Sequence, residues 1–457
     1  MSKSTAQSVL FPHLISKPVL AAFDQDHSSS DGGALLLKAV DDQLGLSERL
    51  AACLRDEREP GKVHHGFDEI LRQRLYAIAL GYPDCNDAQV LAHDPIHKML
   101  AGRAPISGDR LASQSTLSRF ENAVGPCAQY RVADASADTV LGVHRRRLGK
   151  RAKTVILDFD PTDDPTYGQQ EFTFYHGHYR THCYLPLIGT IAFNNEKRQS
   201  LLCAVLRPGN AGAHLGLIPI LDRLLEKVRA AFPKARIRIR LDGGFCSPHV
   251  LDYLDHADVE YVVGLANWPA LKKRAEKARR EAVRAYEKTG KTTQVFGETR
   301  FQTKTTWPHP RRVIFKAEVV DYPGREPRQN LRFVVTNMKM TPKRLYRFYC
   351  QRGAPENRIK ELKHGLELGR TSCSSFLANQ FRVQLTAAAY VLMQELARRA
   401  RHTAYRDAQV TRLRDRLLKL PAWVEESVRR VVVHLPTSFL GKAEWQKIAT
   451  AVGGASP

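Results

Sequence analysis

The spacing of hydrophobic residues predicts that the first third of the chain is mainly helical. Apolar residues recur at helical intervals over residues 34–44 and again over residues 67–80, where Gly81 would end the helix. A third helix is expected over residues 115–124, and it presents hydroxyl groups and Arg119, which suit contacts with phosphates and base edges. The alternative for this third helix is an ordinary solvated face.

From about residue 150 the pattern changes to short apolar runs that are typical of strands. Residues 145–153 read as a basic linker ahead of the first run. Elements then follow in the order β-β-β-α-β-α-β, which predicts an α/β domain. The expected strands cover residues 153–160, 183–194, 201–206, 237–241 and 259–265, and the expected helices cover residues 215–232 and 247–256.

A second change of pattern predicts an insertion into this α/β domain. Residues 269–288 form a very basic helix, and residues 293–337 read as β-hairpins. After Pro342 the chain is helical again through Ala400, and one more strand-like run follows at residues 431–434. We therefore expect a helical region (1–150), a first core segment (151–268), the insertion (269–340), core helices (341–400) and a basic C-terminal region (401–457).

The charge balance favours a polyanionic partner. The 457 residues include 70 Lys and Arg against 47 Asp and Glu, a net charge of +23. Such an excess is typical of proteins that bind nucleic acid or an acidic membrane surface, although a merely basic protein is the alternative. No apolar run approaches the ~18 residues of a membrane span, so we expect a cytoplasmic protein. The eight cysteines form no C-x-x-C pair, which argues against a zinc finger.

Acidic residues stand at the ends of two predicted strands and in a later helix. Asp158 and Asp160 end the first strand, Asp242 follows the fourth, and Glu356 lies after the insertion. If the two strands are neighbours, their terminal acids meet, because ligands gather at the carboxyl ends of strands. Three such carboxylates could hold the two Mg²⁺ ions that assist displacement at phosphorus. For any single acid the alternative is a turn or a helix cap.

The residues around Glu356 form a spaced set of charged and aromatic side chains. On an ideal helix Tyr349, Arg352, Glu356 and Lys363 fall within about 60° of one another. Pro355 fits only the first turn of a helix, so Glu356 is expected near a helix N-terminus. Arg352 and Lys363 would then point at the phosphates that the metals hold, and the alternative is a solvated charged face.

The spacing Y-x2-R-x3-E-x6-K resembles the signature of one branch of the DDE transposases of bacterial insertion sequences. Asp160 with Thr162, and Asp242 within L-D-G-G-F, are similar to the first and second acids of that branch. Longer stretches resemble one group within it, family 1380 of insertion sequences. These stretches are residues 157–171, 240–245 and 349–361.

The resemblance implies an RNase H-like core with a β-rich insertion, preceded by a mainly helical DNA-binding domain. It implies two Mg²⁺ ions, replaceable by Mn²⁺, and DNA cleavage followed by strand transfer, catalysed by Asp160, Asp242 and Glu356. Because DFDPTDD offers four acids, Asp158 remains a further candidate metal ligand and an alternative first acid. Tyr349, Arg352 and Lys363 would handle DNA near the cut.

The partners implied by the same resemblance are double-stranded DNA, as terminal inverted repeats and as target, and a second copy of the chain in a synaptic complex. The protein would then work on the nucleoid. Two alternatives stay open: a nuclease on the same fold that only hydrolyses DNA, and a DNA-binding regulator with an inactive core. The set of acids argues against the second.

Overall fold

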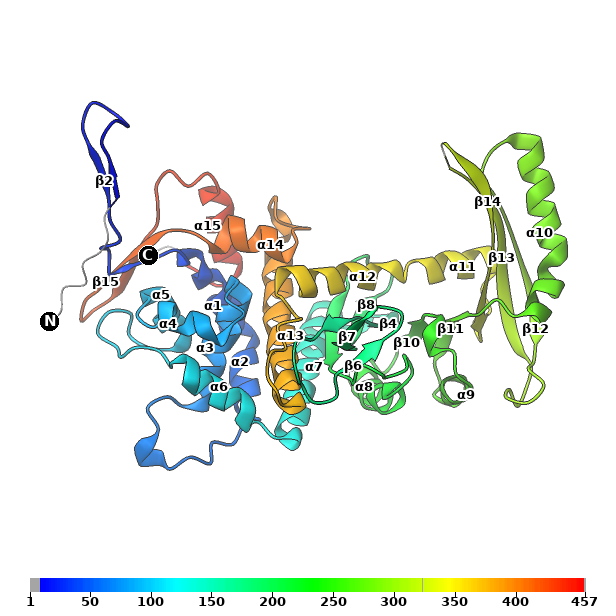
Figure 1. The fold of residues 1–457 in the computed structure, drawn as a ribbon, viewed down its shortest axis with the longest axis horizontal. Helices are drawn as coiled ribbons and strands as arrows, with labels where there is room; N and C mark the ends of the chain where they lie inside the picture. Colours follow the sequence, from blue (N-terminus) through cyan, green and yellow to red (C-terminus); the bar gives the residue numbers. More distant parts are fainter. Residues whose placement is uncertain (1–8, 323, 456–457) are drawn as a thin grey trace. The chain divides into compact units, whose positions relative to one another are not determined.

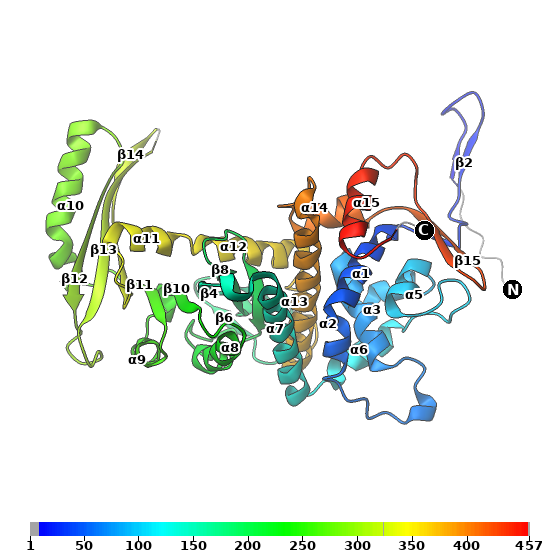
Figure 2. The ribbon, with the colours of Figure 1, turned by 180° about the vertical axis from the view of Figure 1, so that it is seen from behind.

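The computed structural model describes residues 9–322 and 324–455, which form two compact units. Unit 1 combines residues 9–43, 56–120 and 395–455, so it draws on both ends of the chain. Unit 2 combines Leu44–Arg55 with Glu121–Gln394. Figures 1 and 2 show the elements of both units from opposite sides.

Unit 1 contains the three helices predicted in the first third of the chain. The predictions at residues 34–44, 67–80 and 115–124 are confirmed as α1, α3 and α6, and α3 ends where Gly81 adopts a left-handed conformation with a φ of 91°. The helices that lie wholly or mostly in unit 1 are α1 (Leu35–Leu44), α3 (Phe67–Leu80), α4 (Ala88–Leu91), α5 (Pro95–Ala101), α6 (Gln114–Ala123), α14 (Val410–Leu413) and α15 (Lys442–Ala451).

Strands from both ends of the chain pair within unit 1. The strand predicted at residues 431–434 is confirmed as β16 (Val431–His434), which pairs with β15 (Ala422–Glu426), and β15 in turn pairs with β3 (Ser28–Ser29). A separate hairpin joins β1 (Val9–Phe11) to β2 (Val19–Ala21).

A buried carboxylate reinforces the junction between the two chain ends in unit 1. Asp31 is fully buried and accepts hydrogen bonds from Tyr82 (2.9 Å) and His97 (3.0 Å). It also pairs with Lys419 at 2.8 Å. Because a buried carboxylate is stable only with such partners, this cluster links residues 9–43 to the C-terminal segment.

Unit 2 is built on a mixed sheet of eight strands among the described residues. At its centre β4, β10 and β11 run parallel as neighbours, β8 pairs antiparallel with β4, and β9 pairs antiparallel with β8. In sheet order the strands are β12 (Thr293–Phe301), β13 (Arg311–Tyr322), β14 (Arg325–Thr336), β11 (Glu260–Leu265), β10 (Arg236–Leu241), β4 (Thr154–Pro161), β8 (Leu187–Phe193) and β9 (Ser200–Val205).

Helices and a small sheet complete unit 2. Ser247 caps α9 by accepting a hydrogen bond from the Val250 amide. A three-stranded sheet has the order β5 (Asp164–Pro165), β7 (Thr181–Tyr184) and β6 (Phe174–His176). The helices are α2 (Leu46–Ala51), α7 (Pro126–Leu148), α8 (Leu217–Ala231), α9 (Pro248–His256), α10 (Pro269–Thr289), α11 (Pro342–Cys350), α12 (Gly353–Lys360) and most of α13 (Phe376–Arg399).

The basic linker predicted at residues 145–153 is wrong. Residues 145–148 are the last turn of α7, and a short 3-10 helix, Gly149–Arg151, follows them. The reason is packing, because Val140, Leu141 and Leu148 continue the helical spacing and are buried.

The insertion extends the sheet of unit 2. The predicted basic helix and hairpins are confirmed, and β14 pairs with β11, so the new strands continue the central sheet. α10 lies against β12 and β13 (Figure 1). Trp307 is buried between Trp268 and Phe301, which makes it a core residue of the insertion.

The helical prediction after Pro342 is right in part. The chain breaks between α11 and α12, and α12 runs into a π-helical turn, Glu361–Gly365. Residues 366–375 are then irregular before α13 begins. No helix in the described ranges, 9–322 and 324–455, has the length and apolar character to cross a membrane.

Candidate active site

Two predicted acids end neighbouring strands of the central sheet. β4 and β10 are parallel neighbours, which meets the condition set for the two acids to meet, and Asp158 lies opposite Arg240 in register. Two residues further along each strand, the chain reaches Asp160 and Asp242. The Asp242 side chain caps the following 3-10 helix by accepting a hydrogen bond from the Gly244 amide at 2.8 Å.

Asp160 has both acidic and basic side chains near it. Burial raises its pKa to about 6, and the negative charges of Asp242 and Glu356 act in the same direction. Arg352 opposes them, and its Nη1 donates to Asp160 Oδ2 at 3.1 Å. The structure therefore brings all three predicted acids close enough to interact.

Glu356 lies in the first turn of α12, as Pro355 led us to expect. A carboxylate at this place is favoured by the helix dipole. Its side chain is 56% exposed, and its Oε1 lies 4.0 Å from Arg352 Nη2. Arg352 is thus the cation that stands between Asp160 and Glu356.

The donor set has the chemistry of a site for a hard divalent cation. Three carboxylates that repel one another are the oxygen ligands such an ion prefers. No three His, Cys, Asp or Glu side chains already converge on a common point in the part of the chain that the structure describes. The residues fit such an ion if the Arg352 guanidinium turns aside and the exposed Glu356 side chain turns inward.

Asp158, the fourth candidate acid, has a different environment. It is fully buried, and Arg240 holds it with two hydrogen bonds, Nε to Oδ1 at 2.7 Å and Nη2 to Oδ2 at 2.6 Å. Gln199 donates to Oδ2 at 2.8 Å. Both oxygens are engaged, so this environment does not favour the metal-ligand role predicted for Asp158.

Arg240 connects this buried pair to the helix that carries Tyr349. Its Nη1 donates to the carbonyl oxygen of Phe348, in the last turn of α11, at 3.0 Å. The guanidinium also lies 4.9 Å from the centre of the Phe348 ring. Asp158 and Arg240 therefore fix the end of α11 against β4 and β10.

Tyr349 lies beside the second acid. Burial raises the pKa of its phenol, and the charge of Asp242 adds to the effect against that of Arg352. Its hydroxyl reaches Gly264, near the end of β11, where a Cβ would lie 2.6 Å from it and 2.7 Å from the amide nitrogen of Gly243. Only glycine leaves this room.

We expect Gly264→Ala to reduce DNA cleavage roughly a hundredfold, because a displacement of about 1 Å at a reacting site can have that effect. The added methyl group must push back either Tyr349 or the turn after Asp242. Gly142→Ala in α7 is the control, since its Cβ would make only an ordinary contact of 3.7 Å. Cleavage rates and thermal unfolding of both proteins check this expectation, and full activity of Gly264→Ala would contradict it.

Lys363 lies beyond the end of α12, so the ideal α-helical spacing does not describe its position. It lies in the π-helical turn after α12, and its Nζ contacts Asp163 Oδ1 at 2.7 Å. The neighbouring Asp164 accepts a hydrogen bond from Thr371, and burial raises the pKa of Asp164 to about 7. In the structure Lys363 therefore pairs with Asp163, and its charge lowers the pKa of Asp164 against the effect of burial.

Tyr179 was not singled out from the sequence. Burial raises the pKa of its phenol, and the charges of Asp163, Asp160 and Asp242 contribute further, which places the residue beside the carboxylates. It lies in the turn between β6 and β7, and no spacing in the sequence connects this turn to the strand ends. Arg119 belongs to unit 1, where it is exposed on α6.

The model of the family described as transposase DDE domain, group 1, matches residues 11–455. No curated protein matches the chain. A cryo-EM structure of a piggyBac transposase synaptic complex with hairpin DNA is similar over 99% of this chain and 89% of that one, with 9% identity and a TM-score of 0.41. That likeness is too distant to support an argument.

Proposed function

Because the chain belongs to the family of transposase DDE domains, group 1, we propose that it cuts DNA at the ends of an insertion sequence and joins the cut ends to target DNA. The observation that carries this proposal is the gathering of Asp160, Asp242 and Glu356 around Arg352. Displacement at phosphorus builds negative charge on the entering and leaving oxygens, and metal ions held by such carboxylates can stabilise that charge.

We propose an RNase H-like core formed by residues 151–268 and 341–400, with residues 269–340 as its insertion. The strand order supports it. β4 is central, its antiparallel neighbour β8 lies on one side, and the parallel strands β10 and β11 lie on the other. This order places the first two acids on adjacent strands.

The proposed cofactor is a pair of Mg²⁺ ions, for which Mn²⁺ can substitute, held by Asp160, Asp242 and Glu356. When bound, the ions stabilise charge on the entering and leaving oxygens and activate water. We assign Asp158 to positioning, because Arg240 and Gln199 already engage both of its oxygens.

Three further residues act on the DNA in this proposal. Arg352, which contacts Asp160 in the structure, turns to a backbone phosphate when the carboxylates are neutralised. Lys363 adds a second phosphate contact from the π-helical turn, and Tyr349 orients the DNA beside Asp242.

The proposed substrates are the terminal inverted repeats and a target duplex. We propose that the helices within residues 1–150 recognise the repeats, with Arg119 on the exposed face of α6 among the contacts. The proposed synaptic complex contains two copies of the chain.

Metal dependence tests the proposed chemistry. The full chain should cleave a duplex that carries the DNA flanking its own reading frame when Mg²⁺ or Mn²⁺ is present. Ca²⁺ should support binding without cleavage, since geometry and water activation matter more than charge. Cleavage that persists in excess chelator would exclude the proposed role of the metal ions.

A further inference from the structure

We propose that one face of α10 is a binding surface for the backbone phosphates of duplex DNA, separate from the carboxylate site. The inference rests on the proposed function, because it assigns a second DNA contact to the same protein. Five exposed cations follow one another along α10 at intervals of four, three, four and four residues. These residues, which we call the α10 cation stripe, are Lys273, Lys277, Arg280, Arg284 and Lys288.

The stripe has a length and direction that suit a DNA strand. At 100° and 1.5 Å per residue, its members fall within about 80° of one another and extend over about 22 Å. One strand carries a phosphate every ~3.4 Å along the duplex axis and winds around that axis once in about 10 base pairs, so the straight stripe can reach about three or four successive phosphates. The surface along it is hollowed, with a volume of about 620 Å³.

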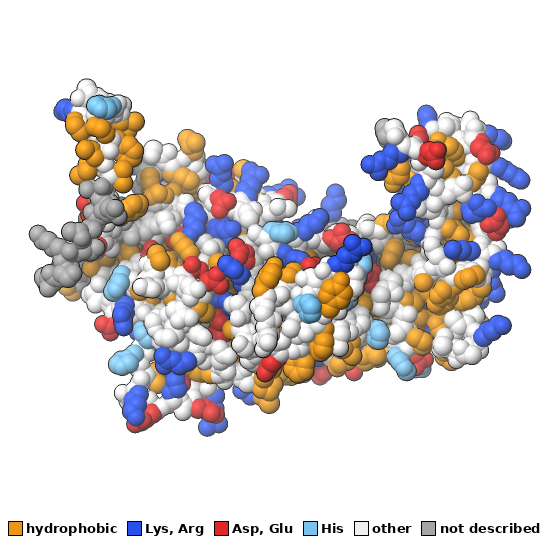
Figure 3. All heavy atoms as spheres, in the orientation of Figure 1, with side chains coloured by type: hydrophobic (Ala, Val, Ile, Leu, Met, Phe, Trp, Pro, Cys, Tyr) orange, Lys and Arg blue, Asp and Glu red, His pale blue; other side chains and the backbone are white. Residues whose placement is uncertain are grey.

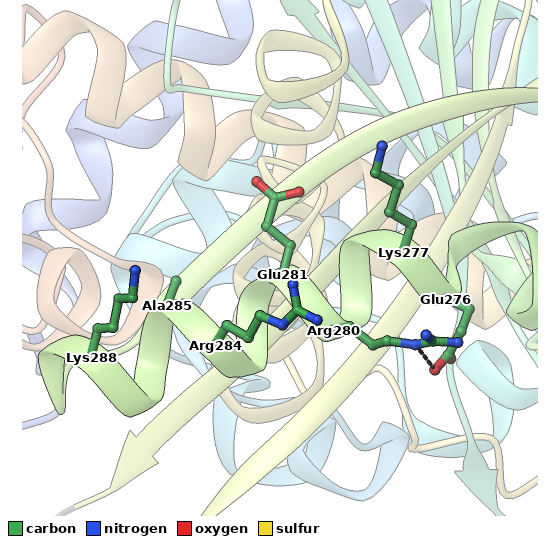
Figure 4. A pocket seen from close by; sticks show the side chains of 7 residues that line it. All are labelled: Glu276, Lys277, Arg280, Glu281, Arg284, Ala285 and Lys288. Carbon is green, nitrogen blue, oxygen red and sulfur yellow. Dashed lines mark hydrogen bonds and ion pairs between the residues drawn. The ribbon is translucent and has the colours of Figure 1, made fainter.

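The side chains of the stripe point outward from the helix. Figure 4 shows Lys277, Arg280, Arg284 and Lys288 along this hollow. Glu281 lies between Lys277 and Arg284 in this view. In Figure 3, Lys and Arg side chains gather over the insertion end of unit 2.

Most of this positive charge is not neutralised within the protein. Lys277, Arg284 and Lys288 form no ion pair with an acid among residues 9–322 and 324–455. Glu276 pairs with Arg280 at 3.1 Å, and it is shared with Arg279 at 2.8 Å. The stripe therefore keeps an excess of positive charge that a polyanion can meet.

The opposite face of α10 shows which polyanion fits. Leu271, Ala275, Ala278 and Ala282 are buried, and the helix packs on β12 and β13. An amphipathic helix that binds a membrane needs an exposed apolar face, whereas the apolar face of α10 is buried against β12 and β13. The exposed part offers only charge, which suits the sequence-independent phosphates of a duplex.

The test replaces four stripe residues together in the full chain: Lys277→Gln, Arg280→Gln, Arg284→Gln and Lys288→Gln. Binding of a short random-sequence DNA duplex is measured by fluorescence anisotropy over a range of salt concentrations, in chelator. We expect affinity at low salt to fall at least about tenfold, and the slope of log K against log salt to fall by about 3 to 4, because each lost phosphate contact removes close to one unit.

A matched control removes the same charge elsewhere in unit 2. Arg145→Gln, Arg146→Gln, Lys150→Gln and Lys234→Gln alter exposed cations on other elements and should leave most of the affinity and slope. In the opposite direction, Glu281→Gln removes an acid from the hollow and should strengthen binding. Equal losses in the two fourfold variants, an unchanged slope in the stripe variant, or a greater loss for duplex RNA than for DNA would each overturn the proposal.

Activity assays with the stripe variant distinguish two sources of the phosphates. Reduced cleavage assigns the stripe to DNA beside the element end, whereas normal cleavage with reduced joining assigns it to target DNA. Because binding is measured without metal, it does not depend on cleavage. Failure of the proposed function can therefore be distinguished from failure of this inference. A wild-type chain that binds duplex through the stripe but never cuts would overturn the function and leave this inference standing.

Discussion

Asp160→Asn, Asp242→Asn and Glu356→Gln are each expected to remove DNA cleavage while leaving the fold and duplex binding intact. Each change removes one negative oxygen ligand and keeps the size of the side chain. Loss of a single preorganised electrostatic group commonly reduces a rate by about 10² to 10³. Because these three carboxylates act as one set, we expect losses at or beyond that range.

Cleavage rates on an end-bearing duplex, with anisotropy for binding, measure this prediction. Glu196→Gln is the matched control, because it removes a carboxylate of unit 2 that pairs with Arg147 at the surface. It should cleave at the normal rate. Full activity in any one of the three acid variants would remove that acid from the proposed site.

The second large effect concerns stability. Asp158→Asn should destabilise unit 2 by about 3 to 5 kcal/mol, the usual result when one partner of a buried ion pair is removed. Arg240 would keep its charge, at 3% side-chain exposure, without the carboxylate that compensates it. Glu196→Gln, which breaks a pair at 25% and 34% exposure, should lower stability by about 0 to 1 kcal/mol.

Denaturant unfolding of the two variants measures this difference. The cleavage rate of Asp158→Asn, taken together with its stability, decides between the two candidate first acids. An Asp158→Asn protein as stable as the wild type but inactive would make Asp158 the metal ligand, in place of Asp160. A destabilised protein with residual cleavage at low temperature would support the positioning role.

The acids were predictable from the sequence because their positions depend on local order. Asp160 lies near the end of β4, Asp242 follows β10 directly, and Pro355 places Glu356 in a first turn. A strand-end acid needs only the correct neighbour strand to meet its partner. The parallel pairing of β4 with β10 supplies that neighbour.

The partners of these acids were not predictable, because they come from residues far apart along the chain. Asp158 and Asp160 are two residues apart, yet Asp158 pairs with Arg240 and Asp160 pairs with Arg352. Gly264 matters only because the Tyr349 hydroxyl approaches its backbone.

Two features of the fold could not be predicted from the sequence because they depend on long-range pairing. The spacing in residues 293–337 gave the hairpins, but nothing local indicates that β14 would pair with β11 and extend the central sheet. In unit 1, the contact of Lys419 with Asp31 joins segments separated by most of the chain. Periodicity describes single elements, and such contacts depend on three-dimensional packing.

The most direct test of the proposed function is joining. A labelled duplex that carries the DNA flanking the reading frame is incubated with the full chain, Mg²⁺ and an unlabelled plasmid. We predict that label becomes covalently attached to the plasmid, and that Glu356→Gln abolishes the attachment. Cleaved duplex with no label in the plasmid would contradict the account, since it would describe a nuclease that only hydrolyses DNA.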